Sequence, residues 1–385
     1  MEKVEKQRGD MVLVMLLVII LGVGLSMLFS ASYSFSARTT GDPLFLLKRQ
    51  LLWGGLGAVA AFVASVTPLS ALRGRMPLVL LGTLAVSLLP FLPGVGSTVL
   101  GSRRWISVFG QSFQPSELVK IVLILYLASY FARRQDAAAN AEEHPGATPR
   151  RTVEGITLNG LIPPFVVAIV FSGIILLQND YSTAVFVLVI ALSMFFMAQV
   201  RLLHLLLVSV FTVPLGFLLL FTREHRVQRL LAFFDLPSYS QGTGYQVVTA
   251  KAAFFTGGLW GRGLGRSAAK LGPLPMSYSD FIYTVTGEET GFLGSLFVLA
   301  LFGLLAWKGF QIAARSPDRF SSYAAFGLTT AITLQALLNM AVAVGLVPTT
   351  GVTLPFFSAG GSSLFATLIM SGLLVNLSRR VTHVQ

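Results

Sequence analysis

The chain has 385 residues, of which 54% are hydrophobic and only 11% are charged, and its mean hydropathy is +0.75. A soluble domain averages roughly 25% charged residues, so the composition excludes a surface that faces water over most of its area. The absence of cysteine excludes disulfides and thiolate metal sites, and the four histidines are scattered, which argues against a metalloenzyme. The net charge of +12 suggests nucleic-acid binding, but the positions of the cations indicate otherwise.

Ten apolar segments follow one another along the chain. A helix needs about 20 mostly apolar residues to cross a bilayer, and these segments approach that length. We therefore predict an all-α integral membrane protein with about ten transmembrane helices, forming a single polytopic domain over residues 1–385. The predicted spans are 11–31, 49–66, 76–93, 116–132, 159–178, 182–199, 203–222, 281–307, 321–345 and 360–377.

The cations between the spans predict the orientation, because cytoplasmic segments carry an excess of lysine and arginine. One alternating set of segments holds Lys3, Lys6, Arg8, Arg73, Arg75, Arg133, Arg134, Arg150, Arg151, Arg201, Lys308, Arg315, Arg319, Arg379 and Arg380. The short loops of the other set hold Arg38, Lys48, Arg103 and Arg104. We predict that the first set is cytoplasmic and, since the number of spans is even, that both termini are too.

The first apolar segment resembles a signal peptide, because basic residues precede it and Ser30-Ala31-Ser32 follows it. Its apolar run of about 20 residues is long for a signal peptide, and the parity of the later spans requires it. We therefore predict an uncleaved first helix.

Two connecting loops are long. Residues 133–155 are rich in Ala, Glu, Pro and Arg and predict a solvated cytoplasmic linker. Residues 223–280 form the large extracytoplasmic loop between helices 7 and 8, where cations alternate with aromatic residues. Within it, 245–256 fit an amphipathic helix on the bilayer surface. This loop is either a passive connector or functional, and its length favours function.

Few ionisable residues lie near the membrane, where such residues are costly and usually functional. Glu117 and Lys120 are three residues apart on one helix face and form either a buried ion pair or part of a site. Asp180 lies at the outer tip of a tight hairpin. Asp280 precedes the eighth span and is either a helix N-cap or a functional acid.

Glu288 and Glu289 follow Asp280 in the predicted eighth helix. Asp280 and Glu288 are expected to share a helix face, with the glutamates about 12 Å deeper by helical rise. Helix packing or hydrogen bonding is the preferred interpretation of both glutamates. Outward-facing acids, a basic and aromatic rim and a helical membrane body together suit an anionic lipid-linked substrate, whose phosphates would meet the cations.

Several sequence blocks resemble the SEDS family, the FtsW, RodA and SpoVE proteins. They run in family order over nearly the whole chain and are jointly specific. The blocks are Gly101-Ser102-Arg103-Arg104-Trp105-Ile106, Gln114-Pro115-Ser116-Glu117-Leu118, Gly244-Tyr245-Gln246, Gly257-Gly258-Leu259-Trp260-Gly261-Arg262-Gly263-Leu264-Gly265, Ser279-Asp280-Phe281-Ile282, Gly287-Glu288-Glu289, Pro348-Thr349-Thr350-Gly351, Leu354-Pro355-Phe356 and Gly360-Gly361-Ser362-Ser363.

The resemblance implies a ten-helix fold in the bacterial cytoplasmic membrane and a peptidoglycan glycosyltransferase. The substrate would be lipid II, and the partner a class B penicillin-binding protein in cell division or elongation; the motifs lean toward FtsW over RodA. By position, Asp280 matches the family's essential aspartate, and Tyr278 replaces a usual histidine, so that histidine is not a required base. The other matching residues are Glu117, Lys120, Asp180, Arg103 and Arg104.

The implied reaction converts an α-phosphate into a β-glycosidic link, which requires inversion and hence a single displacement. Asp280 is the candidate base for the acceptor hydroxyl. Lys120, Arg104 and Lys251, in that order, are candidates to stabilise the departing pyrophosphate. No cofactor is certain, and a divalent cation on Asp280 is left open.

The alternatives are a lipid II flippase, a non-catalytic scaffold and another lipid-linked glycan polymerase. A flippase requires a polar path through both leaflets. The candidate residues instead cluster on the predicted outer side, which favours the transferase.

Overall fold

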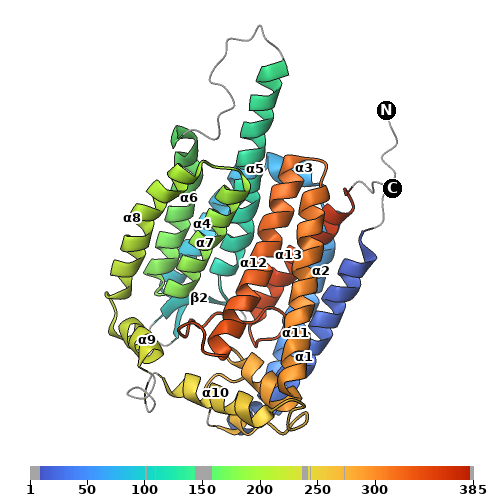
Figure 1. Ribbon diagram of the computed structural model, residues 1–385, viewed down its shortest axis with the longest axis vertical. Coiled ribbons are helices and arrows are strands. Elements are labelled where there is room, and N and C mark those ends of the chain that lie inside the picture. Colours follow the sequence, from blue (N-terminus) through green and yellow to red (C-terminus); the bar gives the residue numbers. More distant parts are fainter. Residues whose placement is uncertain are drawn as a thin grey trace.

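The computed structural model describes residues 9–99, 102–108, 110–143, 158–235, 242, 244–272 and 274–381. It is a bundle of long helices that lie side by side, with α8 at one edge and α1 at the other (Figure 1). The elements in chain order are α1 (Met11–Thr40), α2 (Phe45–Val66), α3 (Leu69–Gly74), α4 (Met76–Leu88), η1 (Leu89–Phe91), β1 (Gly96–Val99), β2 (Ser102–Val108), β3 (Gln111–Phe113), α5 (Ser116–Glu143), α6 (Leu158–Leu177), α7 (Tyr181–Met197), α8 (Leu202–Leu220), α9 (Glu224–Phe234), α10 (Tyr245–Gly257), η2 (Ala269–Leu271), α11 (Ile282–Arg315), α12 (Arg319–Ala343) and α13 (Gly361–Ser378).

A helix coincides with each of the ten predicted spans. The multi-pass helical fold is therefore confirmed, whereas the number of spans stays a prediction. Within the described residues, six helices are long and apolar enough to cross a membrane: Met11–Thr40, Phe45–Val66, Gly160–Leu177, Ile282–Arg315, Arg319–Ala343 and Gly361–Ser378.

The helices α12 and α13 form the centre of the bundle and are buried along most of their length. A helix that is apolar and buried on all sides belongs to a core, whereas a peripheral helix keeps one face for its solvent. The helix α1 illustrates the second case, because Leu16 and Ile20 are buried while Val18 and Ile19 are exposed. In a membrane protein that outer face meets lipid.

A small antiparallel sheet corrects the prediction of an all-α fold. Strands β1, β2 and β3 follow one another in the order β1-β2-β3, with Ser97 opposite Trp105 and Ser107 opposite Ser112. The sheet is fixed to α2, because Arg49 donates to Gln111 Oε1 at 3.0 Å. A hydropathy analysis detects long apolar segments, so it did not detect these short strands between two helical spans.

The two ends of the bundle differ. The described chain begins and ends at the end where α5 projects from the bundle (Figure 1), and Asp10 N donates to Ser378 Oγ at 3.1 Å. The helix α10 lies across the opposite end (Figure 1), which confirms a helix at the predicted position. This arrangement agrees with an even number of spans, while the compartment that each end faces stays a prediction.

The predicted continuous helix over 281–307 is wrong, because the chain reverses within α11. Gly291 has φ 72° and ψ −168°, which is not helical. Tyr283 Oη donates to Ser295 O at 3.0 Å, although twelve residues of straight helix would separate these residues by about 18 Å. Residues 282–290 therefore fold back on the start of the long helix. Asp280 precedes the N-cap Phe281, so it lies outside the helix whose face it was expected to share with Glu288.

Candidate active site

Asp280 lies in the segment that leads into α11, and its carboxylate does not cap that helix. The N-cap residue of α11 is Phe281, which makes no side-chain cap, so the N-cap interpretation of Asp280 is wrong. Ser279 Oγ donates to Asp280 Oδ1 at 2.8 Å. Because the carboxylate is not bound to helix amides, it retains acceptor capacity for a substrate proton.

The backbone of Asp280 is fixed by α12 and by the loop that follows α12. Asn339 Nδ2 on α12 donates at 2.8 Å to both Asp280 O and Val352 O. Ser358 Oγ donates to Ser279 O at 2.7 Å. Residues 279–280 and the loop 345–360 are therefore positioned as one unit.

A glycine in this loop leaves room beside the carboxylate. Gly351 has φ +75°, and a Cβ built on it would lie 3.5 Å from Asp280 Oδ2. Backbone with positive φ strains most residues but not glycine. The glycine of the Thr-Thr-Gly block therefore brings the backbone of this loop close to the Asp280 carboxylate without strain.

Asp180 and Arg104 form an ion pair that belongs to the surroundings of Asp280. Arg104 Nη1 lies 3.0 Å from Asp180 Oδ2, and Gln114 Nε2 donates to the same oxygen at 2.9 Å. The other oxygen, Asp180 Oδ1, caps α7 by accepting from Thr183 N at 3.2 Å. Asp180 thus fixes the hairpin tip and orients the Arg104 guanidinium.

Burial raises the pKa of the Asp280 carboxyl. The hydrogen bond from Ser279 and the charges of Arg104 and Arg229 oppose this rise, whereas the charge of Asp180 adds to it. A carboxylate with a raised pKa is a stronger base once ionised, which suits proton abstraction near neutral pH.

Glu117 and Lys120 form the buried ion pair that their spacing on α5 predicted as one alternative. Lys120 Nζ lies 2.8 Å from Glu117 Oε2 and donates to Gln335 Oε1 on α12 at 2.6 Å. Gln335 Nε2 in turn donates to Thr353 O at 3.0 Å. Since the two charged side chains are 3% and 9% exposed, this network acts inside the bundle and supports the loop that also holds Asp280.

Arg103 and Lys251 are not joined to this cluster. Arg103 is exposed, and it precedes Arg104 on β2, where successive side chains point to opposite faces. Lys251 is exposed on α10 and lies over the turn after α12, because a Cβ on Gly345 would come within 2.5 Å of its Cε. Of the four candidate cations, Arg104 is the one whose charge acts on the Asp280 carboxyl and opposes the rise of its pKa.

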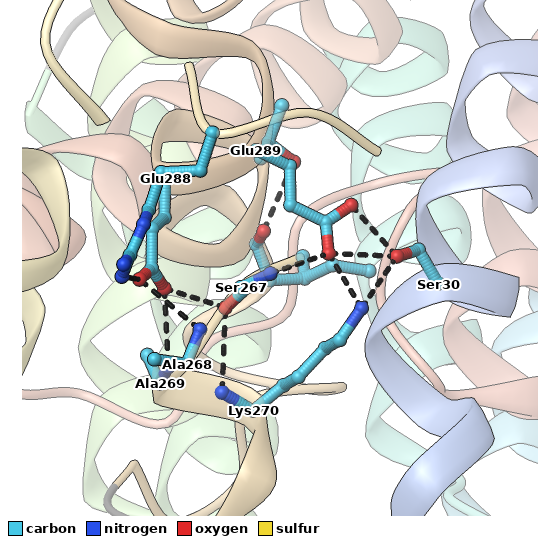
Figure 2. A network of polar contacts seen from close by, with 10 residues as sticks. Ser30, Ser267, Ala268, Ala269, Lys270, Glu288 and Glu289 are labelled. Atoms are coloured by element: carbon cyan, nitrogen blue, oxygen red, sulfur yellow. Dashed lines mark hydrogen bonds and ion pairs between the residues drawn. The ribbon is translucent and has the colours of Figure 1, made fainter. Parts of the chain in front are cut away.

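Glu288 anchors the glycine-rich segment that follows α10 (Figure 2). Its carboxylate accepts from Ser267 Oγ at 2.5 Å and from the backbone amides of Ala268 and Ala269, each at 3.1 Å. Arg262 Nη1 adds an ion pair at 3.3 Å. These contacts are those of a buried anchor for the loop.

Glu289 connects the same segment to the first helix (Figure 2). Lys270 Nζ lies 2.6 Å from its Oε1, and Ser30 Oγ on α1 donates to its Oε2 at 2.7 Å. The Lys270 and Glu289 side chains are 4% and 0% exposed. Both glutamates bind this segment just before the reversal at Gly291.

Analysis of the sequence missed several polar partners of the site. Gln335 and Asn339 are four residues apart, on one face of the otherwise apolar span α12, and that spacing is the signal that could have identified them. Gln114 stood in one of the family-like blocks but had no assigned role, and Arg229 carried no comparable signal, because a surface polar residue is ordinary.

A metal site does not emerge from the side chains present. No group of three or more His, Asp or Glu residues gathers as potential metal ligands in the parts of the chain that the structure describes.

Comparison with known proteins identifies the family. The model of the family of cell cycle proteins FtsW, RodA and SpoVE matches residues 10–383. The chain belongs to this family. It is 36% identical over 372 residues to the "Probable peptidoglycan glycosyltransferase FtsW" of Geobacter sp. (strain M18), covering 97% of each chain. It is 34% identical to the "Stage V sporulation protein E" of Bacillus subtilis (strain 168), covering 97% of this chain and 98% of the relative.

Solved structures agree with this assignment. A chain of a peptidoglycan synthase complex is similar with a TM-score of 0.73 and 27% identity, over 96% of this chain and 98% of that chain. Thermus thermophilus RodA is similar with a TM-score of 0.68 and 27% identity, over 97% and 98% of the two chains. The predicted family is confirmed, and the names FtsW and stage V sporulation protein E are consistent with the lean toward FtsW.

Proposed function

We propose that the chain joins lipid II units into β-1,4-linked glycan strands, with Asp280 as the general base. The enzyme class follows from relatives named peptidoglycan glycosyltransferase, which are 34–36% identical over nearly the whole chain, so the chain is a peptidoglycan glycosyltransferase. The observation that supports the site is the Asp280 carboxylate, which does not cap α11 and interacts electrostatically with Arg104.

The proposed reaction is one displacement with inversion. The acceptor 4-hydroxyl oxygen forms a bond to the anomeric carbon of the donor, while the bond between that carbon and the pyrophosphate oxygen breaks. The hydroxyl proton passes to Asp280, and the bonding electrons leave with the pyrophosphate. A positioned base typically contributes 10²–10⁴-fold to such a rate.

The contacts change the proposed order of the cations. The charge of Lys120 is neutralised by Glu117, and its ammonium group also donates a hydrogen bond to Gln335 inside the bundle. Arg104 is 31% exposed at its side chain and has donors left for phosphate oxygens. We therefore place Arg104 first for the departing pyrophosphate, and assign Lys120 to positioning the loop at Thr353.

The proposed setting is the outer face of the bacterial cytoplasmic membrane, with a class B penicillin-binding protein as partner. The support for a partner is the similarity to a chain of a peptidoglycan synthase complex that coordinates polymerization and crosslinking. The support for the outer face is the distribution of lysine and arginine along the sequence.

The experiment uses purified wild type and Asp280→Asn, each given lipid II with and without the penicillin-binding protein. Wild type is expected to make polymer, and the isosteric Asp280→Asn variant is expected to lose at least about 10²-fold in rate because it lacks the base. Equal polymerisation by both would reject Asp280 as the base.

Flipping of lipid II across liposomes is measured in parallel. The relatives named above carry glycosyltransferase or sporulation names, which favours the polymerase. Transport of lipid II without polymer from either protein form would instead support the flippase alternative.

A further inference from the structure

A groove of about 510 Å³ lies between α4 and α5, toward the C-terminal end of α5, which projects from the bundle (Figure 1). Met76, Pro77 and Leu80 of α4 form its apolar wall. This groove contains no residue of the proposed active site and has no part in the reaction described above.

The α5 side of the groove is one continuous helix face. Tyr126, Ser129, Tyr130, Arg133 and Arg134 line it, at spacings of three and four residues. The face is aromatic at Tyr126 and Tyr130 and cationic at Arg133 and Arg134.

The two arginines lie at the depth expected for lipid headgroups. Arg133 is seventeen residues from Ser116, about 26 Å by helical rise, which is close to the ~30 Å thickness of the hydrocarbon core. Tyr130 lies one turn closer to the centre, and tyrosine is enriched at membrane interfaces.

Both guanidiniums retain unused donors. Arg134 Nη1 donates to Tyr130 Oη at 2.8 Å, and Arg133 Nη2 donates to Arg73 O at 2.8 Å. Neither arginine has a carboxylate partner among the residues that the structure describes; the nearby Asp136 pairs with Arg73 at 3.5 Å and with Arg319 at 3.6 Å.

We propose that this groove binds one anionic glycerophospholipid, with its phosphate on Arg133 and Arg134 and an acyl chain along Leu80 and Tyr126. Two exposed guanidiniums match a phosphodiester, since arginine donates to phosphate in a fixed fork. Basic pockets between transmembrane helices on the cytoplasmic side are suited to anionic lipid headgroups. An acidic peptide would match the cations but not the apolar, membrane-level wall.

The test is native mass spectrometry of the full chain, released from bilayers with equal amounts of phosphatidylglycerol and phosphatidylcholine. Wild type is expected to retain one phosphatidylglycerol. The double variant Arg133→Gln/Arg134→Gln is expected to retain it at least about tenfold less, because two headgroup contacts are lost. Leu80→Trp, which fills the groove without changing charge, is expected to lose it as well.

The matched control is Arg201→Gln/Arg380→Gln, which removes two exposed arginines outside the groove on the same predicted side. It is expected to retain the lipid as wild type does. Equal loss in this control, equal retention of phosphatidylcholine, or full retention by either groove variant would overturn the proposal. A co-purifying polypeptide in the groove instead of lipid would also overturn it.

Discussion

At the scale of residues, the proposed roles of Asp280 and Arg104 depend on local backbone geometry. The helix α11 is capped at Phe281, so the Asp280 carboxylate is not consumed by helix amides. On β2 the alternation of side chains turns Arg104 toward Asp180 and leaves Arg103 exposed. Substitution of Arg104 is therefore expected to affect the reaction more than substitution of Arg103.

The pH dependence of the reaction follows from the raised pKa of Asp280. The base must be ionised, so activity is present above this pKa and is lost as the pH falls through it. Ser279→Ala removes a hydrogen bond that lowers the pKa, so the acidic limb of the profile should move to higher pH.

The measurement is kcat/KM for lipid II polymerisation as a function of pH. Ser316→Ala is the control, because the Ser316 hydroxyl donates to Ile312 O, at 2.8 Å, at the other end of α11. An acidic limb that stays in place or moves to lower pH in Ser279→Ala would contradict the assignment of the base.

The two arginines of β2 give a matched pair. Arg104→Gln should lower kcat by about 10²-fold or more, the usual effect of losing one donor to a developing negative charge. Arg103→Gln should change kcat little, because Arg103 is exposed on the opposite face. The measurement is the steady-state kcat of both variants. Equal effects would contradict the assignment of Arg104 alone to the departing pyrophosphate.

At the scale of elements, two networks tie distant helices to the loops that carry function. Lys120 joins α5 to α12 through Gln335, beneath the loop at Thr353. Glu289 and Lys270 join α11 and the glycine-rich segment to α1 (Figure 2). Both are buried pairs, so each partner depends on the other for neutralisation.

Single changes in the α5 pair should therefore be costly. Lys120→Met leaves Glu117 as an unpaired buried charge, and Glu117→Gln does the same to Lys120, each at an expected cost of about 3–5 kcal/mol. The double variant Glu117→Leu/Lys120→Met should recover much of this loss. Thermal unfolding in detergent measures the stability of the three variants. Single variants as stable as wild type would show that the pair is not structural.

The reversal in α11 depends on one glycine. Gly291→Ala should destabilise the fold strongly, because φ 72° with ψ −168° excludes a side chain and the new Cβ would lie 2.4 Å from Gly261 N. Gly303→Ala in the same element is the control, since its Cβ would have no neighbour within 4 Å. The unfolding temperature should fall in Gly291→Ala and should stay the same or rise slightly in Gly303→Ala. Equal unfolding temperatures of the two variants would contradict the reversal.

At the scale of the whole molecule, the proposed active site and the proposed lipid groove belong to different ends of the bundle. The helix α10 lies across one end, and α5, which carries Arg133 and Arg134 in its C-terminal half, projects from the other (Figure 1). The distribution of lysine and arginine predicts that the first end is extracytoplasmic.

The absence of cysteine makes this sidedness directly measurable. A single cysteine in Leu264→Cys, at an exposed position after α10, should react with a membrane-impermeant maleimide in intact cells. A single cysteine in Pro317→Cys, exposed between α11 and α12, should react only after the membrane is permeabilised. The reverse pattern would invert the orientation and place Asp280 on the cytoplasmic side.

The sequence by itself determined the membrane class, the positions of the helices, the family and the main candidate acids. Those properties are local, because an apolar segment of sufficient length and a short motif are each complete within one stretch of chain. The pairing of Glu117 with Lys120 was also accessible, since their separation of three residues places them on one helix face.

Only the tertiary structure decided which residues meet across the chain. It joined Asp280 to Asn339, bound Lys120 to Gln335 and separated Arg104 from Arg103. It also reversed the chain at Gly291 and bound Glu288 to the amides of Ala268 and Ala269. These outcomes depend on long-range packing and on a single φ angle, and neither leaves a periodic signal in the sequence.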